Sequence, residues 1–239
     1  MRRATLTAHR KPPHSPSRMP LPALSLLETR VLGVLVEKRH TVPDTYPLTL
    51  NALVAGCNQK SSRDPVLDAR EGDVQAAVDH LRQLSLVVES SGGRAMRYAE
   101  NAARVLGLPT ESVALLATLM LRGAQTAAEL RANCERLHRF SDLSSVEAYL
   151  DELRARAGGP FVAELPRRPG SRETRWMHLL SGPPDPAALA EPAHAAVHGD
   201  AVSAGEIAAI KRNVDDLARE VAGLKATLAQ VMEDLGIKR

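Results

Sequence analysis

Residues 111–134, ESVALLATLMLRGAQTAAELRANC, carry the signals for two consecutive helices. Apolar residues recur at helical spacing up to Met120, and Gly123 supplies a helix stop. Thr126 and Glu129, three residues apart, have the pattern of a capping box that starts the second helix. That helix then carries a leucine and a cysteine one turn apart on one face, at residues 130 and 134. The stretch therefore predicts a helix, a short connection and a second helix.

The same order of elements occurs earlier in the chain. Residues 26–40 have the apolar spacing of a helix, and Pro43 and Pro47 occupy the entry to the next one. Leu53 and Cys57 then repeat the leucine–cysteine spacing of the later copy. The match favours a buried packing role for both cysteines, because a free cysteine usually behaves as a small hydrophobic residue.

A third helix and a hairpin complete each copy. The third helices are expected to begin with capping pairs, Asp68 with Glu71 and Ser144 with Glu147. β-prone runs separated by turns follow at residues 86–98 and 161–179. Arg97-Tyr98 and Arg175-Trp176 hold the same place in the two hairpins. Three helices followed by a hairpin, twice over, predict an α+β fold that is mainly α, with tandem winged-helix domains.

The rest of the chain has a different composition. We predict a disordered basic tail at 1–22, winged-helix domains at 23–107 and 108–182, and a flexible linker rich in Pro, Ala and Gly at 183–204. Residues 205–239 are predicted to form a C-terminal coiled-coil helix, because apolar residues from 207 to 235 alternate in steps of three and four. This seam predicts a parallel homodimer. The alternative is a single amphipathic helix that folds back on the domains.

The positive charge is concentrated at the amino-terminal end. The chain has a net charge of +3, and residues 1–22 carry five bases and no acid. The two repeats carry twenty bases and nineteen acids, which leaves +1. The tail could therefore be a disordered start or a basic arm that contacts phosphates, whereas the repeats are nearly neutral.

The sequence offers little support for catalysis. Cys57 and Cys134 lack CxxC spacing, so we expect reduced cysteines, no metal and no cofactor. The eight histidines form no HExxH motif, and there is no glycine-rich phosphate loop, so we expect a protein that is not an enzyme. The absence of an 18-residue apolar run or a secretory signal predicts a cytoplasmic protein with no membrane contact.

Positively charged side chains in loops and wings are the candidate nucleic-acid-binding residues. Guanidinium groups on a hairpin suit bidentate phosphate contacts, and a nearby aromatic ring could stack on a base. The set is Lys60, Arg63, Arg94, Arg97, Arg167, Arg168, Arg172, Arg175 and Trp176. The third helices, by contrast, carry several carboxylates, which oppose insertion into a phosphate-lined groove. The polar run 43–66 could be a binding loop or only a connection.

Three motifs make the chain similar to a known family. YPLTLNALVAGCNQKSSRDPV at 46–66, LMLRGAQTAAELR at 119–131 and GPFVAELPRRPGSRETRWMHLLSG at 159–182 resemble the YceH-like bacterial proteins. The resemblance extends from Leu24 to Leu235 and implies a tandem winged-helix fold and a cytoplasmic location. It implies no assigned biochemical function and no catalytic residues, and residues 1–22 have no place in it.

Two functional hypotheses follow from the residues. The first is a non-enzymatic nucleic-acid-binding protein, such as a transcriptional regulator, that contacts DNA phosphates through its wings and polar loop. The second is a scaffold that binds protein partners through its acidic third helices and its coiled coil. A continuous basic face formed by the polar loop and both wings would favour the first.

Overall fold

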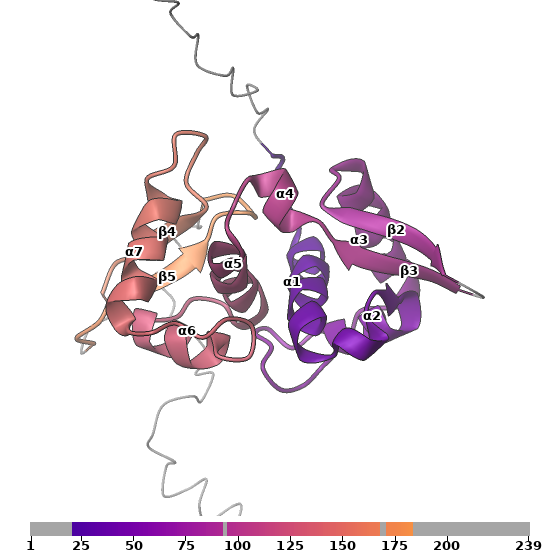
Figure 1. Ribbon diagram of the computed structural model, residues 1–239, viewed down its shortest axis with the longest axis horizontal. Coiled ribbons are helices and arrows are strands. Elements are labelled where there is room, and N and C mark those ends of the chain that lie inside the picture. The colour runs from indigo at the N-terminus through magenta and orange to yellow at the C-terminus, as the bar shows by residue number, and fades with distance from the viewer. Residues whose placement is uncertain (1–20, 93–94, 168–170, 184–239) are drawn as a thin grey trace, which may run out of the picture. The chain divides into compact units, whose positions relative to one another are not determined.

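The computed structural model describes residues 21–92, 95–167 and 171–183, all of which belong to one compact unit (Figure 1). The predictions for the basic tail up to residue 20, for the linker from residue 184, and for the coiled-coil dimer lie outside the described residues. The candidate residues Arg94 and Arg168 lie outside them as well.

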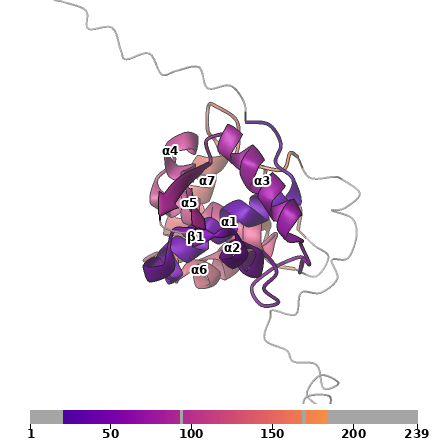
Figure 2. The same cartoon turned by 90° about the vertical axis from the view of Figure 1, so that its right-hand side faces the viewer.

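The first half, which faces the viewer in Figure 2, contains a three-helix cluster and a three-stranded antiparallel sheet. Its strands have the order β1-β3-β2, and Thr49 at the end of β1 caps α2 by accepting a hydrogen bond from Ala52 N. In chain order the elements are α1 (Leu26–Thr41), the 3-10 turn η1 (Pro43–Thr45), β1 (Leu48–Thr49), α2 (Leu50–Cys57), α3 (Glu71–Gln83), β2 (Val87–Gly92) and β3 (Ala95–Glu100).

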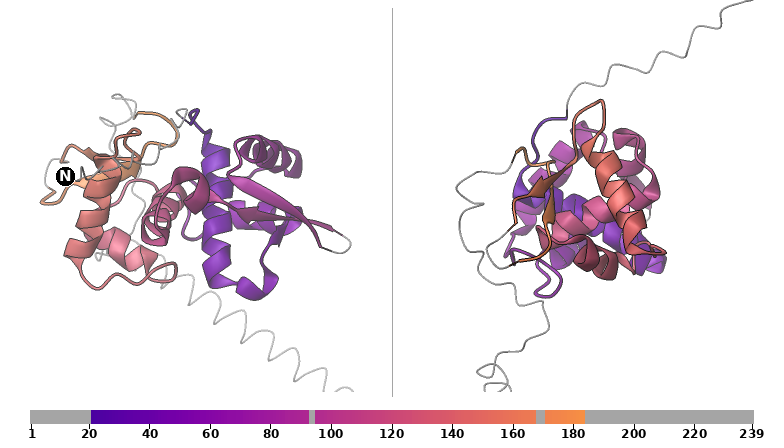
Figure 3. Two further views of the ribbon diagram at one scale, coloured as in Figure 1. Left: turned by 45° about the horizontal axis from the view of Figure 1, so that its top comes forward. Right: turned by 90° about the vertical axis from the view of Figure 1, so that its left-hand side faces the viewer.

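The second half, which faces the viewer in the right panel of Figure 3, repeats this plan with a smaller sheet. The short helix α4 (Ala102–Leu106) connects the two halves. The elements that follow are α5 (Thr110–Arg122), α6 (Ala127–Cys134), α7 (Leu143–Arg154), β4 (Val162–Leu165) and β5 (Arg175–His178). The described residues are thus α+β, as the sequence predicted, and about half of them are helical.

The backbone pairing supports the equivalence of the two copies. In the first half Leu48 pairs with Tyr98, just before α2. In the second half Gln125 pairs with Trp176, just before α6, through backbone bonds of 2.7 and 3.0 Å. The predicted equivalence of Tyr98 and Trp176 therefore holds in three dimensions. The sequence did not predict β1, α4 or the bridge at Gln125, because pairings this short leave no periodic pattern.

The two first helices, α1 and α5, pack against each other at the centre of the unit (Figure 1). Every residue from Glu28 to Val36 and from Ser112 to Leu121 is buried, so both helices are enclosed on all sides. A Cβ on Gly33 would lie 3.0 Å from Leu121 Cγ, which shows how closely the helices approach. The halves therefore share one core.

Helix caps were predicted with mixed success. The capping box of Thr126 and Glu129 is confirmed, and Cys57 and Cys134 are both free and buried, as predicted. The predicted caps of the third helices are wrong. Arg70 occupies the N-cap of α3 without a side-chain bond, and Asp142 caps α7 by accepting a hydrogen bond from Ser145 N. Both helices thus begin at a residue other than the predicted one, and in α7 the cap is still a local one.

Candidate nucleic-acid interface

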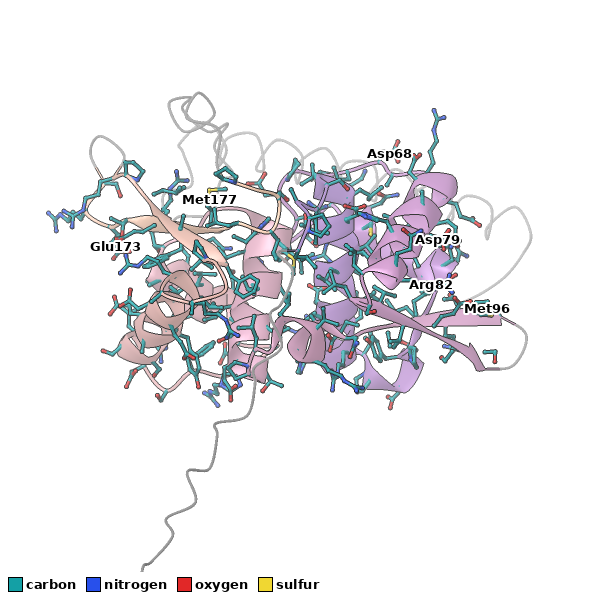
Figure 4. The ribbon with its side chains drawn as sticks, turned by 90° about the horizontal axis from the view of Figure 1, so that it is seen from above. Asp68, Asp79, Arg82, Met96, Glu173 and Met177 are labelled. Carbon is teal, nitrogen blue, oxygen red and sulfur yellow. The ribbon has the colours of Figure 1, made fainter. Side chains whose placement is uncertain are left out.

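The two hairpins predicted to be wings, β2-β3 and β4-β5, lie at opposite ends of the compact unit and are called the first and second wing below. Figure 4 shows Met96 on the first hairpin at one end and Glu173, beside the second hairpin, at the other. The described cations of the two wings therefore do not share one continuous face. Because a shared face would have favoured DNA binding by both wings together, each wing has to be considered alone.

In the first wing, Arg97 stabilises the fold of its own domain. Arg97 is half-buried on β3, and its Nη1 donates to the carbonyls of Thr45 and Pro47 at 3.3 and 2.8 Å. These bonds fix the turn that leads into β1 and α2. Arg97 is therefore engaged with the backbone of its own domain.

The second wing borders a cavity of about 460 Å³ between α6, α7 and the hairpin. Arg167 and Arg172 are exposed on its rim, as the sequence predicted for wing cations. Carboxylates also line it, from Glu147 and Asp151 on α7 and from Glu164 and Glu173 on the hairpin. Opposite charges are thus mixed in this cavity, which makes it less favourable for phosphate than the wing sequence suggested.

Trp176 is not placed to stack on a base. Its side chain is only 6% exposed, and the Arg154 guanidinium lies 5.2 Å from the ring centre. Arg154 is itself paired with Asp151 and Glu164, at 2.7 and 2.9 Å. Arg175, the residue before the tryptophan, is partly buried at the start of β5. This part of the wing belongs to the core of the second half.

Arg63 lies inside the protein. Its side chain has 0% exposure, and it binds the Glu37 carboxylate with both terminal nitrogens, at 2.6 and 3.1 Å. Further hydrogen bonds reach the Gly56 and Ser62 carbonyls and Gln59 Oε1, so all five guanidinium N–H groups have acceptors. Arg63 therefore organises the polar connection and has no donor left for a phosphate.

A second buried cation holds the same connection. Arg30 of α1 is completely buried and donates to the carbonyls of Cys57 and Pro65, at 3.1 and 2.6 Å. Asp64, the residue before Pro65, donates its backbone N–H to Leu121 O at the carboxyl end of α5. The segment predicted as either a binding loop or a connection is thus tied to both halves.

Cations from both halves meet beside this connection. A cavity of about 180 Å³, here called the junction cavity, is lined by the end of α1, residues 59–62, the end of α5, and α6 with its following turn. Three cations line it: Lys38, Arg122 and Arg136. Lys60, a predicted contact residue, is exposed on the adjoining loop. Sequence reasoning missed the three lining cations because they are separated by up to 98 positions and resemble ordinary helix-end charges.

The single carboxylate that lines the junction cavity, Glu37, is already paired. Burial raises its pKa, but hydrogen bonds from Arg63 and the charges of Arg63 and Lys38 outweigh burial and hold the pKa below its ordinary value. Arg122 donates from Nη2 to Ser62 Oγ at 2.7 Å and makes no ion pair within the described ranges. Burial lowers the pKa of Arg122, the Glu37 charge opposes this, and Arg63 reinforces it. A guanidinium nevertheless stays protonated.

The described residues show no group of three His, Cys, Asp or Glu side chains arranged for a metal ion. Burial raises the pKa of Cys57 to about 12 and also raises that of Cys134, so neither thiol is activated. Among the described helices, none has the length and apolar character required to cross a bilayer.

Comparison with known proteins assigns the chain to a family. Residues 24–171 match the family described as "Protein of unknown function, DUF480". The chain belongs to the DUF480 family. UPF0502 proteins are similar to this DUF480 member over nearly their whole length. The one from Methylibium petroleiphilum is 57% identical over 93% of this chain and 94% of its own.

Two further relatives show the same extent of similarity. A UPF0502 protein of Dechloromonas aromatica is 56% identical over 87% of this DUF480 chain and 96% of its own. One from Burkholderia orbicola is 54% identical, over 94% of each chain. The family assignment is consistent with the resemblance to uncharacterised bacterial proteins that the three motifs indicated.

Proposed function

We propose that this protein is a non-enzymatic, cytoplasmic nucleic-acid-binding protein that contacts phosphates at the junction of two winged-helix domains. The observation that carries the proposal is the excess of cations gathered there over the one lining acid, Glu37: the cations are Lys38, Lys60, Arg122 and Arg136. The outermost of them, Lys60 and Arg136, are exposed and can reach a phosphate backbone. Transcriptional regulation is a role that such binding would serve.

The proposal departs from the usual winged-helix mode, in which the third helix enters the major groove. The exposed side chains of α3 include Glu71 and Asp73, and those of α7 include Glu147, Asp151 and Glu152. These carboxylates would repel phosphates along a groove. We therefore expect contacts with the backbone, little base specificity and strong salt dependence.

Fluorescence anisotropy with labelled duplex and single-stranded DNA, across a series of NaCl concentrations, tests this proposal. The double variant Lys60→Glu/Arg136→Glu is expected to bind at least tenfold more weakly and to flatten the salt dependence by about two phosphate contacts. The matched control, Arg167→Glu/Arg172→Glu, changes the net charge equally but lies on the second wing. Undetectable binding by the wild type at low salt, or equal losses in both variants, would contradict the proposal.

A second candidate function is protein binding in a groove along α7. The cavity of about 460 Å³ beside the second wing and a neighbouring cavity of about 310 Å³ share the lining residues Ala128 and Leu143. Leu143 is 38% exposed. An apolar floor with a rim of both charges suits a peptide segment that carries apolar and charged side chains. Loss of a defined protein partner from Leu143→Asp, with the DNA affinity unchanged, would favour this function.

A further inference from the structure

We propose that the junction cavity is a binding site for a small phosphoryl anion, either inorganic phosphate or a phosphomonoester. This site goes beyond nucleic-acid binding, because it lies within the cavity between the two halves rather than along an exposed strand of cations. The charge of the cavity lining, its hydrogen-bond donors and its size all favour such an anion.

The lining has more positive than negative charge. Lys38, Arg122 and Arg136 supply three cations, whereas Glu37 is the single acid among the residues that line the cavity. Arg63, which does not itself line the cavity, binds the Glu37 carboxylate through two hydrogen bonds and so neutralises its charge. Asp64 lies nearby, with its Oδ2 3.2 Å from where a Cβ of Gly123 would be, but its carboxylate does not line the cavity.

Helix ends reduce this positive charge without cancelling it. The carboxyl ends of α1, α5 and α6 all approach the cavity, and each carries about −0.5 elementary charge. Neutralising these three helix ends would thus use about half of the positive charge of the three cations. The remainder is available to an anion that enters the cavity.

Suitable hydrogen-bond donors line the same space. Arg122 uses one N–H for Ser62 Oγ, and no other acceptor for it is present among the described residues. A guanidinium presents its N–H groups as a planar fork, which matches two oxygens of a phosphoryl group. The exposed hydroxyl of Ser61 and the ammonium of Lys38 provide further donors. Lys38 lies 3.2 Å from Gln59 Oε1 and 3.3 Å from Glu37, so it is held at the cavity.

The size of the cavity limits the ligand. Pockets for drug-sized molecules usually measure about 300–1,000 Å³, whereas the junction cavity measures about 180 Å³. A phosphoryl group with a few waters fits this space better than a whole nucleotide does. Because both halves supply lining residues, a bound anion would also strengthen the docking of the first half on the second.

Isothermal titration calorimetry and thermal unfolding of the full chain test the site. The probes are inorganic phosphate and glycerol phosphate, each compared with chloride at the same ionic strength. We expect one-to-one binding and a rise of several degrees in Tm for the wild type. Arg122→Gln and Lys38→Gln should each weaken phosphate binding at least tenfold, whereas Arg104→Gln, at an exposed position on α4, should bind as the wild type does.

A second pair of variants keeps every lining cation in place. Ser61→Asp puts a negative charge at the cavity and should abolish phosphate binding. Ser61→Asn introduces a side chain of nearly the same size as aspartate but without the charge, and it should retain most of the binding. Preference for glycerol phosphate would identify a phosphomonoester as the ligand class, and preference for the inorganic ion would identify free phosphate. A phosphate-dependent rise in Tm that is equal in wild type, Arg122→Gln and Ser61→Asp would overturn the proposal, because general salting-out acts on any surface.

The outcome is separable from DNA binding. Phosphate binding that survives Lys60→Glu, in a protein with no DNA affinity, would leave the anion site intact and remove only the nucleic-acid proposal. DNA binding without any phosphate-specific heat or Tm shift would support the nucleic-acid proposal and contradict the anion site.

Discussion

Replacing Arg63 by methionine is expected to destabilise the folded protein by about 3–5 kcal/mol, because it removes one partner of a buried ion pair. Methionine fills much of the space of the arginine stem, so the loss reports the charge and hydrogen bonds. The change leaves the Glu37 carboxylate, whose side chain is 16% exposed, with Lys38 at 3.3 Å as its remaining cation. The Gly56 and Ser62 carbonyls and Gln59 Oε1 also lose their donor.

Urea unfolding at pH 7.5, followed by far-ultraviolet circular dichroism, measures the effect. With an m-value of about 2 kcal/mol/M, a loss of 3 kcal/mol lowers the midpoint by about 1.5 M. Arg82→Met is the control, because Arg82 makes exposed or partly exposed ion pairs with Asp79 and Glu89 and should cost under about 1 kcal/mol. The double variant Arg63→Met/Glu37→Gln should be less unstable than the sum of the single changes.

The Arg63–Glu37 ion pair also makes the stability of the fold depend on pH. The pKa of Glu37 is lower in the folded protein than its ordinary value, so its ion pair stabilises the fold above about pH 4.5 and is lost at lower pH. Arg63→Met should weaken this acid-dependent loss. If the free energy of unfolding of Arg63→Met lies within 1 kcal/mol of the wild-type value, at an unchanged m-value, the Arg63–Glu37 pair does not organise the connection.

Three further predictions concern other parts of the fold. Burial lowers the pKa of His178 to about 4, so the unfolded protein binds a proton there more readily than the folded one. The free energy of unfolding of the wild type should therefore fall by up to about 2 kcal/mol between pH 6.5 and pH 5, whereas that of His178→Leu should not. Urea unfolding at each pH measures this, and parallel pH profiles for the two proteins would exclude it. Gly56→Ala should destabilise by about 1–3 kcal/mol, because a Cβ there would lie 2.6 Å from Val34 Cγ1. Gly72→Ala, with nothing within 4 Å of the added Cβ, should stabilise by about 0.5–1 kcal/mol, and calorimetric Tm values that move in the same direction for both glycines would contradict the packing argument.

Much of the secondary structure follows from local signals. The apolar spacing of residues 113–120, the stop at Gly123 and the capping pair Thr126–Glu129 each act over a few residues, so the sequence shows α5 and the start of α6 directly. Comparison of the two copies also placed Tyr98 and Trp176 at equivalent positions. The predicted caps of α3 and α7 were wrong because several residues near each start can cap a helix: α3 begins after Arg70, which makes no side-chain bond, and α7 begins after Asp142.

The candidate site shows where local reasoning ends. Lys60, Arg167 and Arg172 are exposed, as expected of contact residues, but Arg63 and Trp176 are buried. Nothing in the string CNQKSSRDPV indicates that one of its two cations faces solvent while the other binds a carboxylate 26 positions away. That difference arises from long-range packing between α1 and the connection.

The sequence by itself determined the repeat, its helices and hairpins, and the near-neutral charge of the two copies, because these depend on residue type and on spacing along the chain. Only the tertiary structure decided that α1 and α5 share one core, that the wings lie at opposite ends, and that Lys38, Arg122 and Arg136 line one cavity. The physical reason is that burial and electrostatic pairing depend on distance in space, and residues far apart in the chain come close only when the two halves pack together.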